Sequence, residues 1–300
     1  MGYTNNKGKE LVDAIHVTWT RPMGVDKPFL PLYELLCTIL SALNWHKYNG
    51  KIKLYTDVKG YEMYEDYGVL DLWDEVDTDT LMSIPRSINP NVFWAGAKAF
   101  ALQNEADKNP DKPIVMIDTD LVIWDNIMNH TNNHKVVAYH QEPFSDYGDS
   151  YPVPEDIFRP NGYTFPAEWN FAVEPCNTAL TYYESTALLK EYTSQWIRFM
   201  KNNPDHRNDD WVTQMVFAEQ RILPMVADQM GMDMGYFILN PEDECNSFTH
   251  LWGAKSEANE DVALFEALCY SLGQAIVRMH PNYTFSETVK KYGKSYIIKK

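Results

Sequence analysis

The sequence predicts an α/β fold in which a mostly parallel sheet is flanked by helices, followed by a helical carboxyl-terminal part. Short apolar runs alternate with longer helical patterns over residues 11–124, which is the order of a βαβ series. Helical patterns with apolar residues at three- and four-residue steps return after residue 182. The chain has 300 residues and 45% hydrophobic content, enough for one large core, so we expect a single domain over residues 1–300.

The amino-terminal part is expected to contain four strands and three helices. The strands are predicted at residues 12–18, 52–56, 69–72 and 114–117. The helices between them are predicted at residues 32–45, 60–67 and 92–107. Ligands of such sheets bind beyond the carboxyl ends of the strands, so the polar and aromatic residues at those ends are the first candidates for a binding site.

The carboxyl-terminal part begins with a stretch over residues 139–169 that holds five prolines and many aromatic residues, which is typical of an ordered lid or binding loop. Three further helices are predicted near residues 182–200, 211–218 and 257–279. No apolar run approaches the roughly 18 to 20 residues of a membrane span. The first residues are polar, so we expect a cytoplasmic protein.

The charge balance limits the partners. Lys and Arg total 26 against 42 Asp and Glu, a net charge of -16, which repels nucleic acid. A small anionic ligand would need a bound divalent cation and local lysines to reverse this field. Cys37, Cys176, Cys245 and Cys269 lie far apart with no CxxC pair, which favours a reducing compartment over a zinc ribbon or a disulfide framework.

The strongest local signal is the pair Asp118 and Asp120, directly after the apolar strand at residues 114–117. Residues two apart in an extended chain point the same way, so the two carboxylates are expected to converge on a cation that prefers oxygen ligands, Mn²⁺ or Mg²⁺. The alternative is that an Asp at the end of a strand only caps the helix that follows.

Seven segments, taken in order, carry a resemblance to a known family. They are residues 18–19, 54–57, 94–102, 117–124, 176–180, 219–223 and 250–255. Together they resemble the GT-A glycosyltransferases, especially the glycogenin and bacterial lipopolysaccharide galactosyltransferase group, and also bacterial capsular polysaccharide glycosyltransferases. The chain departs from the family's late His-x-x-Gly-x-x-Lys element, because one residue is missing before Lys255, so the loop geometry there must differ.

The resemblance implies a GT-A fold and a metal-dependent transferase. A sugar would pass from a nucleotide diphosphate donor, a UDP-sugar by resemblance, to a glycan or lipid-linked glycan acceptor. Residues 1–125 would be the nucleotide-sugar-binding half and residues 126–300 the acceptor-binding half. The metal ligands would be Asp118, Asp120 and His250. The residues expected to contact the donor are Thr18, Trp19, Tyr55, Thr56, Asp57, Lys98, Asp118, Thr119, Asn177 and Lys255.

The resemblance also favours retention of the anomeric configuration, with Gln220 near the reacting face of the donor sugar and Glu219 beside it. An inverting reaction would instead need a carboxylate to take the acceptor's proton. The candidates for that role are Glu168, Glu174, Asp209, Asp210 and Glu219. Six aromatic residues could stack on acceptor sugars or pack against one another, namely Tyr139, Phe144, Tyr147, Tyr151, Tyr163 and Trp169.

Several alternatives stay open at this point. Lys98 could neutralise phosphate or be an exposed lysine of an amphipathic helix. The Lys-rich tail over residues 290–300 could touch an anionic membrane or be solvated. Asp118-Thr-Asp-Leu-Val122 also fits the nucleophile motif of haloacid-dehalogenase-like phosphatases, with Asp209-Asp210 as their acidic pair. A non-catalytic sugar or nucleotide binder would have a similar sequence.

Overall fold

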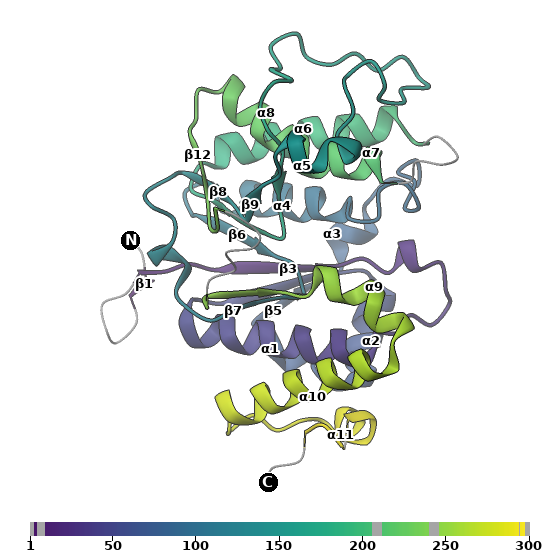
Figure 1. Cartoon of the computed structure of the whole chain (residues 1–300), viewed down its shortest axis with the longest axis vertical. Helices are drawn as coiled ribbons and strands as arrows, with labels where there is room; N and C mark the ends of the chain where they lie inside the picture. Colours follow the sequence, from purple (N-terminus) through teal and green to yellow (C-terminus); the bar gives the residue numbers. More distant parts are fainter. Residues whose placement is uncertain (1–2, 5–9, 206–211, 240–245, 294, 298–300) are drawn as a thin grey trace.

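A seven-stranded sheet forms the centre of the computed structural model (Figure 1), which describes residues 3–4, 10–205, 212–239, 246–293 and 295–297. In spatial order the strands are β12 (Met234–Tyr236), β8 (Val136–Ala138), β11 (Leu180–Tyr183), β6 (Ile114–Ile117), β3 (Ala14–Thr18), β4 (Ile52–Thr56) and β5 (Glu75–Asp77). Only β11 runs antiparallel to its neighbours. The predicted α/β class with a mostly parallel sheet is therefore confirmed.

The order of the strands reverses at β3. The chain moves from β3 outward to β4 and β5 on one side, and then returns to place β6 on the other side of β3. At such a reversal the connecting segments leave toward opposite faces, which opens a crevice beyond the carboxyl ends of the two strands. Asp118 directly follows β6, and Trp19 directly follows β3, so both lie at the carboxyl ends of the two strands between which the order reverses.

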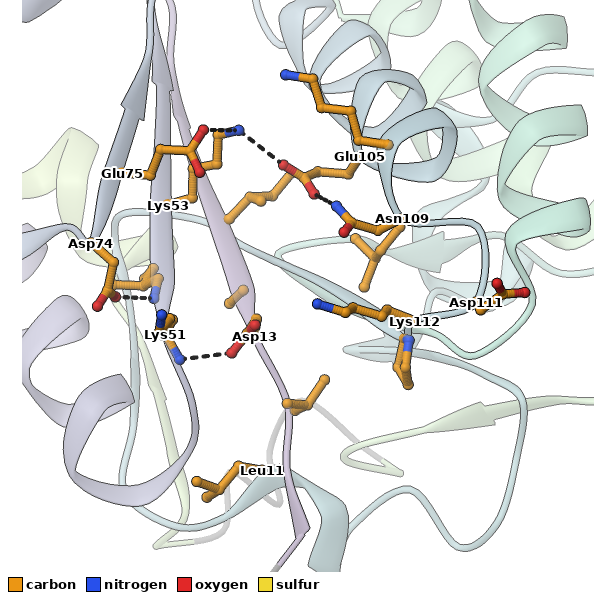
Figure 2. A pocket seen from close by; sticks show the side chains of 17 residues that line it. Leu11, Asp13, Lys51, Lys53, Asp74, Glu75, Glu105, Asn109, Asp111 and Lys112 are labelled. Atoms are coloured by element: carbon orange, nitrogen blue, oxygen red, sulfur yellow. Dashed lines mark hydrogen bonds and ion pairs between the residues drawn. The ribbon is translucent and has the colours of Figure 1, made fainter. Parts of the chain in front are cut away.

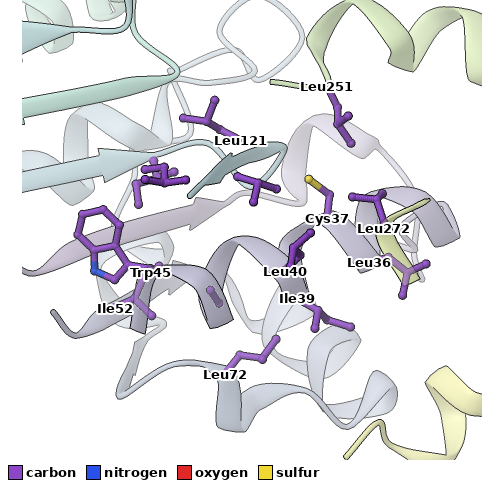
Figure 3. Packing of buried hydrophobic residues seen from close by; sticks show 14 of the residues in the cluster. Leu36, Cys37, Ile39, Leu40, Trp45, Ile52, Leu72, Leu121, Leu251 and Leu272 are labelled. Atoms are coloured by element: carbon purple, nitrogen blue, oxygen red, sulfur yellow. The ribbon is translucent and has the colours of Figure 1, made fainter. Parts of the chain in front are cut away.

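Helices cover both faces of the sheet (Figure 1). One face carries α1 (Leu32–Tyr48) and α2 (Val58–Tyr67), and α10 (Val262–Met279) packs on α1, on the side away from the sheet. The other face carries α4 (Ala97–Lys108), α6 (Thr186–Asn202) and α8 (Ile222–Gln229). Figure 3 shows the first of these layers, in which Leu36, Leu40 and Trp45 of α1 lie among other buried residues of the same core. The apolar periodicity of these helices produces this packing, because each has an apolar side to bury.

Shorter elements complete the fold. The minor strands are β1 (Tyr3–Thr4), β2 (Glu10–Leu11), β7 (Leu121–Ile123), β9 (His140–Gln141), β10 (Cys176–Asn177) and β13 (Phe248–His250). The short helices are α3 (Asp79–Met82), α5 (Phe144–Tyr147), α7 (Thr213–Val216), α9 (Trp252–Glu260) and α11 (Glu287–Gly293). Four 3-10 turns are η1 (Arg21–Met23), η2 (Leu70–Leu72), η3 (Ile127–Asn129) and η4 (Gly148–Ser150), and η5 (Phe217–Arg221) is a π-helix.

One predicted strand is wrong. Residues 69–72 were expected to be extended, but Leu70–Leu72 is the 3-10 turn η2, and the parallel edge strand is Glu75–Asp77. Gly68 ends α2 in the left-handed conformation, at φ 65°, and sends the chain into the turn. The edge strand β5 (Glu75–Asp77) was not predicted, because edge strands tolerate acidic residues. Glu75 and Asp77 remove the apolar alternation that marks a strand.

Three helix predictions also need correction. The predicted helix at residues 92–107 begins only at Ala97, and the one at 182–200 begins at Thr186, because residues before it form β11. The predicted helix at 257–279 is two helices, since the Asp261 side chain accepts hydrogen bonds from the amides of Ala263 and Leu264 and starts a new one. Part of the helix predicted at 211–218 lies outside the described residues.

Within the described part of the chain, one helix, α10, is long and apolar enough to cross a membrane by length and composition. The expectation that no apolar run approaches this length is therefore wrong. α10 packs against α1 with Leu272 and Ile276 buried, but only 22% of its residues are buried in the described chain.

His16, in the middle of β3, is a titratable residue within the core. The side chain is completely buried, Trp73 Nε1 donates to its Nδ1 at 3.2 Å, and its Nε2 lies 3.2 Å from Ser41 Oγ. Burial lowers the pKa of His16 to about 3; His46 lowers it further and Asp120 opposes the shift. The imidazole is thus neutral in the folded protein, and Nε2 carries the proton that it donates to Ser41.

We predict that His16 makes the protein less stable in mild acid. The unfolded histidine takes up a proton below its ordinary pKa of 6.5, whereas the folded one does not until about pH 3, so stability is full above pH 6.5 and falls as the pH drops through this window. Urea unfolding at pH 7.5 and pH 5.0 should show a loss of about 2 kcal/mol from this group. His16→Gln should lack that part of the loss; an equal loss in the variant would contradict the assignment.

Candidate functional site

Asp118 and Asp120 sit in a turn between β6 and β7. The amide of Leu121 donates to the carbonyl of Asp118 at 3.0 Å, which closes the turn, and the amide of Asp118 donates to the carbonyl of Ala179 on the neighbouring chain segment at 2.8 Å. The argument that an extended chain points both carboxylates the same way is therefore wrong. The helix-capping alternative is also wrong, because the strand β7 follows the turn.

A second strand pair brings His250 to this turn. β13 runs antiparallel to β7 with His250 opposite Leu121, and the amide of Leu251 donates to the carbonyl of Asp120 at 3.0 Å. His250 Nε2 lies 3.6 Å from Asp120 Oδ2, and both side chains are more than nine-tenths buried. The ring of Tyr139 packs edge-on against the imidazole, with 5.4 Å between centroids. Backbone pairing thus unites two polar residues that lie far apart in sequence.

Lys255 meets the same carboxylate from α9. Its Nζ lies 2.8 Å from Asp120 Oδ2, so the missing residue in the His250–Lys255 segment does not keep the lysine from the turn. Burial works against the charged form of Asp120, but the nearby His250 and the charge of Lys255 outweigh it and hold the pKa of Asp120 below its usual range. The pKa of Lys255 is raised, since Asp120 outweighs the cost of burial. Asp120 is therefore an anion held by the Lys255 ammonium, with the His250 imidazole close by.

Lys98 of α4 forms an ion pair with Asp118, as Lys255 does with Asp120. Its Nζ lies 2.6 Å from Asp118 Oδ1 and 2.7 Å from Glu219 Oε1, and only 13% of the lysine side chain is exposed. The alternative of an exposed lysine is wrong. Burial opposes the ammonium charge, yet the two carboxylates raise the pKa of Lys98. Burial and the nearby Asp118 raise the pKa of Glu219, and Lys98 opposes that shift.

Glu219 and Gln220 lie in the π-helix η5, between α7 and α8. A π-turn widens the helix and often occurs at functional sites, because it re-aims the side chains that it carries. The neighbouring Arg221 is buried and donates to the carbonyls of Val173 and Phe171 at 3.0 and 2.5 Å. Tyr192 donates to the carbonyl of Glu219 at 2.5 Å. These bonds tie the π-turn to α6 and to the loop before β10.

Asp120 and His250 fit a shared divalent ion. Two ligands that each lie about 2.1 Å from one ion are separated by roughly 3 to 3.6 Å, which matches the Oδ2–Nε2 distance of 3.6 Å. Asp118, the third predicted ligand, faces Lys98 instead, and no group of three His, Cys, Asp or Glu in the described ranges is arranged to hold a metal. The metal site with all three ligands stays a prediction that requires Asp118 to leave Lys98.

Most of the other expected donor-binding residues are engaged within the protein. The Thr18 hydroxyl bonds to Tyr64 at 2.8 Å, and Asp57 caps α2 through the amide of Gly60 at 2.9 Å. Tyr55 donates to Glu105 at 2.5 Å. Trp19 and Thr56 are buried, and Thr119 lies half-buried in the turn. Nucleotide binding by these residues remains a prediction.

Of the carboxylates proposed as a base for inversion, Glu219 alone among the described residues contacts the cluster around Asp118. Glu174 accepts from the amide of Phe144 at 2.8 Å, and Glu168 is exposed. Asp209 and Asp210 lie outside the described residues. Four of the six aromatic residues proposed for sugar stacking are buried, so for these the packing alternative holds: Tyr139, Tyr151, Tyr163 and Trp169.

Two polar groups that contact predicted site residues were not predicted in that position, Glu142 and the hydroxyl of Tyr151. Glu142 is buried and accepts from Asn177 Nδ2 at 3.1 Å, and Tyr151 bonds to both Glu142 and Gln220. Glu142 lies near the start of the proline-rich stretch, and no spacing or motif distinguishes it from the other acids there. The sequence indicated only that residues 139–169 form an ordered lid or binding loop.

A cavity of about 720 Å³ lies at the opposite edge of the sheet, at the amino ends of β3, β4 and β6 (Figure 2). Its charges are largely compensated from within, because Lys53 pairs with Glu75 at 2.7 Å and with Glu105 at 3.3 Å. The Asp13 carboxylate accepts from the amide of Lys51 at 2.9 Å. The cavity shares no residue with the Asp118 turn, and its lining is close to neutral, with five carboxylates against four lysines.

Comparison with known proteins assigns the chain to a family whose function is unknown. Residues 26–262 match the family of unknown function DUF6734, and the chain belongs to this family. No curated protein matches the chain. Among solved structures, the chain is similar to apo mouse xyloside xylosyltransferase 1, with 9% identity, 75% of this chain and 85% of that chain covered, and a TM-score of 0.36. It is also similar to a glycosyltransferase involved in glycosylation of the major capsid of PBCV-1, with 12% identity, coverage of 86% and 98%, and a TM-score of 0.41. TM-scores this low carry no argument, so any function must be argued from the site.

The Lys98 cluster leads to a stability prediction. Lys98→Met leaves Asp118 and Glu219 close together without their cation and should lower the free energy of unfolding by about 3 kcal/mol. Adding Glu219→Gln removes one of the two carboxylates that have lost their cation. The double variant should therefore recover part of the lost free energy of unfolding, as measured by urea unfolding.

Lys190→Met is the matched control. Lys190 pairs with Asp107 at 2.9 Å, but both side chains are well exposed, so the expected change is at most about 1 kcal/mol. Strictly additive effects of Lys98→Met and Glu219→Gln would show that the buried pair is not coupled.

Proposed function

We propose that the chain is a metal-dependent glycosyltransferase of the GT-A type, moving a sugar from a UDP-sugar to a glycan or lipid-linked glycan with retention of configuration. The observation that carries the proposal is the cluster at the turn after β6. Five elements, namely α4, the turn, η5, β13 and α9, bring three carboxylates, two lysines and an imidazole together beside the point where strand order reverses.

Transfer from a nucleotide diphosphate requires negative charge to be stabilised on the departing phosphates. A divalent cation, Mn²⁺ or Mg²⁺, would supply that stabilisation when bound. Asp120 and His250 would hold it, and Asp118 would join them or bind the ribose hydroxyls. Lys255 and Lys98 now neutralise Asp120 and Asp118, and each would be free to bind a phosphate oxygen once its carboxylate has another cation.

Gln220 and Glu219 would act at the sugar. Glu219 is joined to Asp118 through Lys98, and Gln220 follows it in the π-helix, which supports placing both beside the donor. An amide oxygen carries partial negative charge and takes up no proton near neutral pH. Gln220 is thus suited to stabilise positive charge at the anomeric carbon on the face opposite the leaving diphosphate.

The remaining expectations are part of the same proposal. The protein would act in the cytoplasm, and a lipid-linked acceptor would bring it to the inner membrane face. In the described part of the Lys-rich tail, Lys290 pairs with Glu287 at 2.7 Å and Tyr292 is exposed. Residues 294 and 298–300 lie outside the described residues.

The phosphatase alternative requires Asp118 to be a free nucleophile after the first strand of the fold. Three strands of the central sheet precede β6 in the chain, and the Asp118 carboxylate is paired with Lys98. No feature of the site favours this alternative. Hydrolysis of an aryl phosphate that disappears in Asp118→Asn but survives in His250→Ala would establish it against our proposal.

We predict that Mn²⁺ and UDP bind together. Thermal unfolding with a panel of UDP- and GDP-linked sugars should show stabilisation only when metal and nucleotide are both present, by about 2.7 kcal/mol at a ligand concentration 100 times Kd. Chromatographic detection of released UDP and of the transferred sugar separates an enzyme from a non-catalytic binder.

His250→Ala should weaken Mn²⁺ binding about tenfold or more, because even residues that only support a metal ligand often contribute that much. His134→Ala is the control, since His134 also pairs with an aspartate, Asp233, at 3.2 Å but lies on the surface away from the turn. Equal metal affinity in the wild type and His250→Ala, or the same loss in His134→Ala, would refute the metal site.

A further inference from the structure

The amide of Gln220 is held by a chain of buried polar groups from the proline-rich stretch. Tyr151 Oη lies within hydrogen-bonding distance of both Glu142 Oε2 and Gln220 Oε1. The other oxygen of Glu142 accepts from Asn177 Nδ2 at 3.1 Å. Tyr151 and Glu142 are more than nine-tenths buried, so each of these groups needs a partner within the protein.

The number of available protons decides which group donates in each of these hydrogen bonds. A tyrosine has one hydroxyl proton, and both of its neighbours, as placed, are acceptors. A carboxylate is the stronger acceptor, so the proton goes to Glu142. Burial, followed by the charge of Glu142, raises the pKa of Tyr151 far above 10, which keeps the phenol protonated.

Gln220 must then donate to Tyr151 rather than accept from it. A half-turn of its planar amide exchanges the oxygen and the nitrogen without moving the rest of the side chain. The NH₂ group then donates to Tyr151 Oη, Tyr151 donates to Glu142, and Asn177 donates to the second oxygen of Glu142. Every group in the chain has a partner of the right kind, and the Gln220 oxygen points away from Tyr151.

We propose that Tyr151 and Glu142 are positioning residues that fix the orientation of the Gln220 amide and present its oxygen to the donor sugar. This inference rests on the proposed function, in which Gln220 acts at the anomeric carbon. The Asn177 side chain is itself fixed, because its oxygen accepts from the amide of Ala179 at 3.0 Å, and Ala179 in turn binds the amide of Asp118. Asn177 and Ala179 thus connect the turn that carries Asp118 to the groups that orient the Gln220 amide.

Tyr151→Phe tests the inference, with Tyr163→Phe as the matched control. Tyr163 belongs to the same stretch and is equally buried, but its hydroxyl has no hydrogen-bond partner among the described residues. Tyr151→Phe should lower kcat for sugar transfer by up to about 100-fold, while the affinity for UDP with Mn²⁺ stays near the wild-type value. Tyr163→Phe should change neither.

A double variant separates positioning from a general loss of structure. In a Gln220→Ala background, adding Tyr151→Phe should lower kcat by less than about twofold, because the tyrosine acts through the amide that has been removed. Glu142→Gln, which keeps the side-chain volume, should also lower kcat in the wild-type background, since its amide is a weaker acceptor for the Tyr151 proton. Independent, multiplying effects of Tyr151→Phe and Gln220→Ala would overturn the inference.

An NMR readout keeps this test distinct from that of the proposed function. With selective ¹⁵N-glutamine labelling, the side-chain NH₂ signal of Gln220, assigned by its loss in Gln220→Ala, should shift in Tyr151→Phe and stay unchanged in Tyr163→Phe. An unchanged signal in Tyr151→Phe would overturn the positioning role even if the enzyme transfers sugar. A shifted signal together with no turnover of any nucleotide sugar by the wild type would instead overturn the proposed function, and with it the catalytic meaning of the contact.

Discussion

A buried carboxylate, Asp120, and a half-buried one, Asp118, follow the strand β6 and require positive charge close by, and the site is arranged around that requirement. An ionised carboxylate is costly to bury unless it is paired and hydrogen-bonded. Asp120 meets Lys255 and His250, and Asp118 meets Lys98, each pair at a distance that permits direct contact except for the imidazole at 3.6 Å. The partners come from α4, α9 and β13, so the charge balance of the turn also joins segments from distant parts of the chain.

This arrangement relates stability to the proposed chemistry. Lysines that neutralise carboxylates in the absence of a ligand would become available to phosphate when a divalent cation takes over their carboxylates. Lys98 is shared between Asp118 and Glu219, so a change at the metal ligands would alter the charge near the π-helix that carries Gln220. The cluster holds three carboxylates against two lysines, so a bound divalent cation would still be needed to offset, for an anionic donor, the repulsion expected from a chain of net charge -16.

The sequence predicted the main parts of the fold and the first parts of the site for identifiable reasons. Strongly apolar β6 and the periodic helices α1 and α6 bury their side chains as their patterns require. The meeting of His250 with Asp120 followed from the order of family-like segments, and not from either residue alone. The acidic edge strand β5 and the 3-10 turn before it were missed, because local composition there opposes the tertiary pairing.

Other parts could not be read from the sequence, because they depend on how distant segments meet. Whether Lys98 is exposed or buried is decided by Glu219, a residue 121 positions later. The contacts of Tyr151 with Glu142 and Gln220 depend on the path of a long irregular segment, for which no periodicity exists. The turn at Asp118 replaced the extended geometry that the spacing of the carboxylates had favoured.

The central claim is that Asp120 and His250 hold one divalent ion, and pulsed EPR of Mn²⁺ bound together with UDP tests it most directly. We predict a nitrogen coupling to the manganese electron spin in the wild-type protein, absent from His250→Ala when Mn²⁺ is supplied at saturation. A manganese spectrum without nitrogen coupling in the wild type, or one whose coupling persists in His250→Ala, would contradict the account.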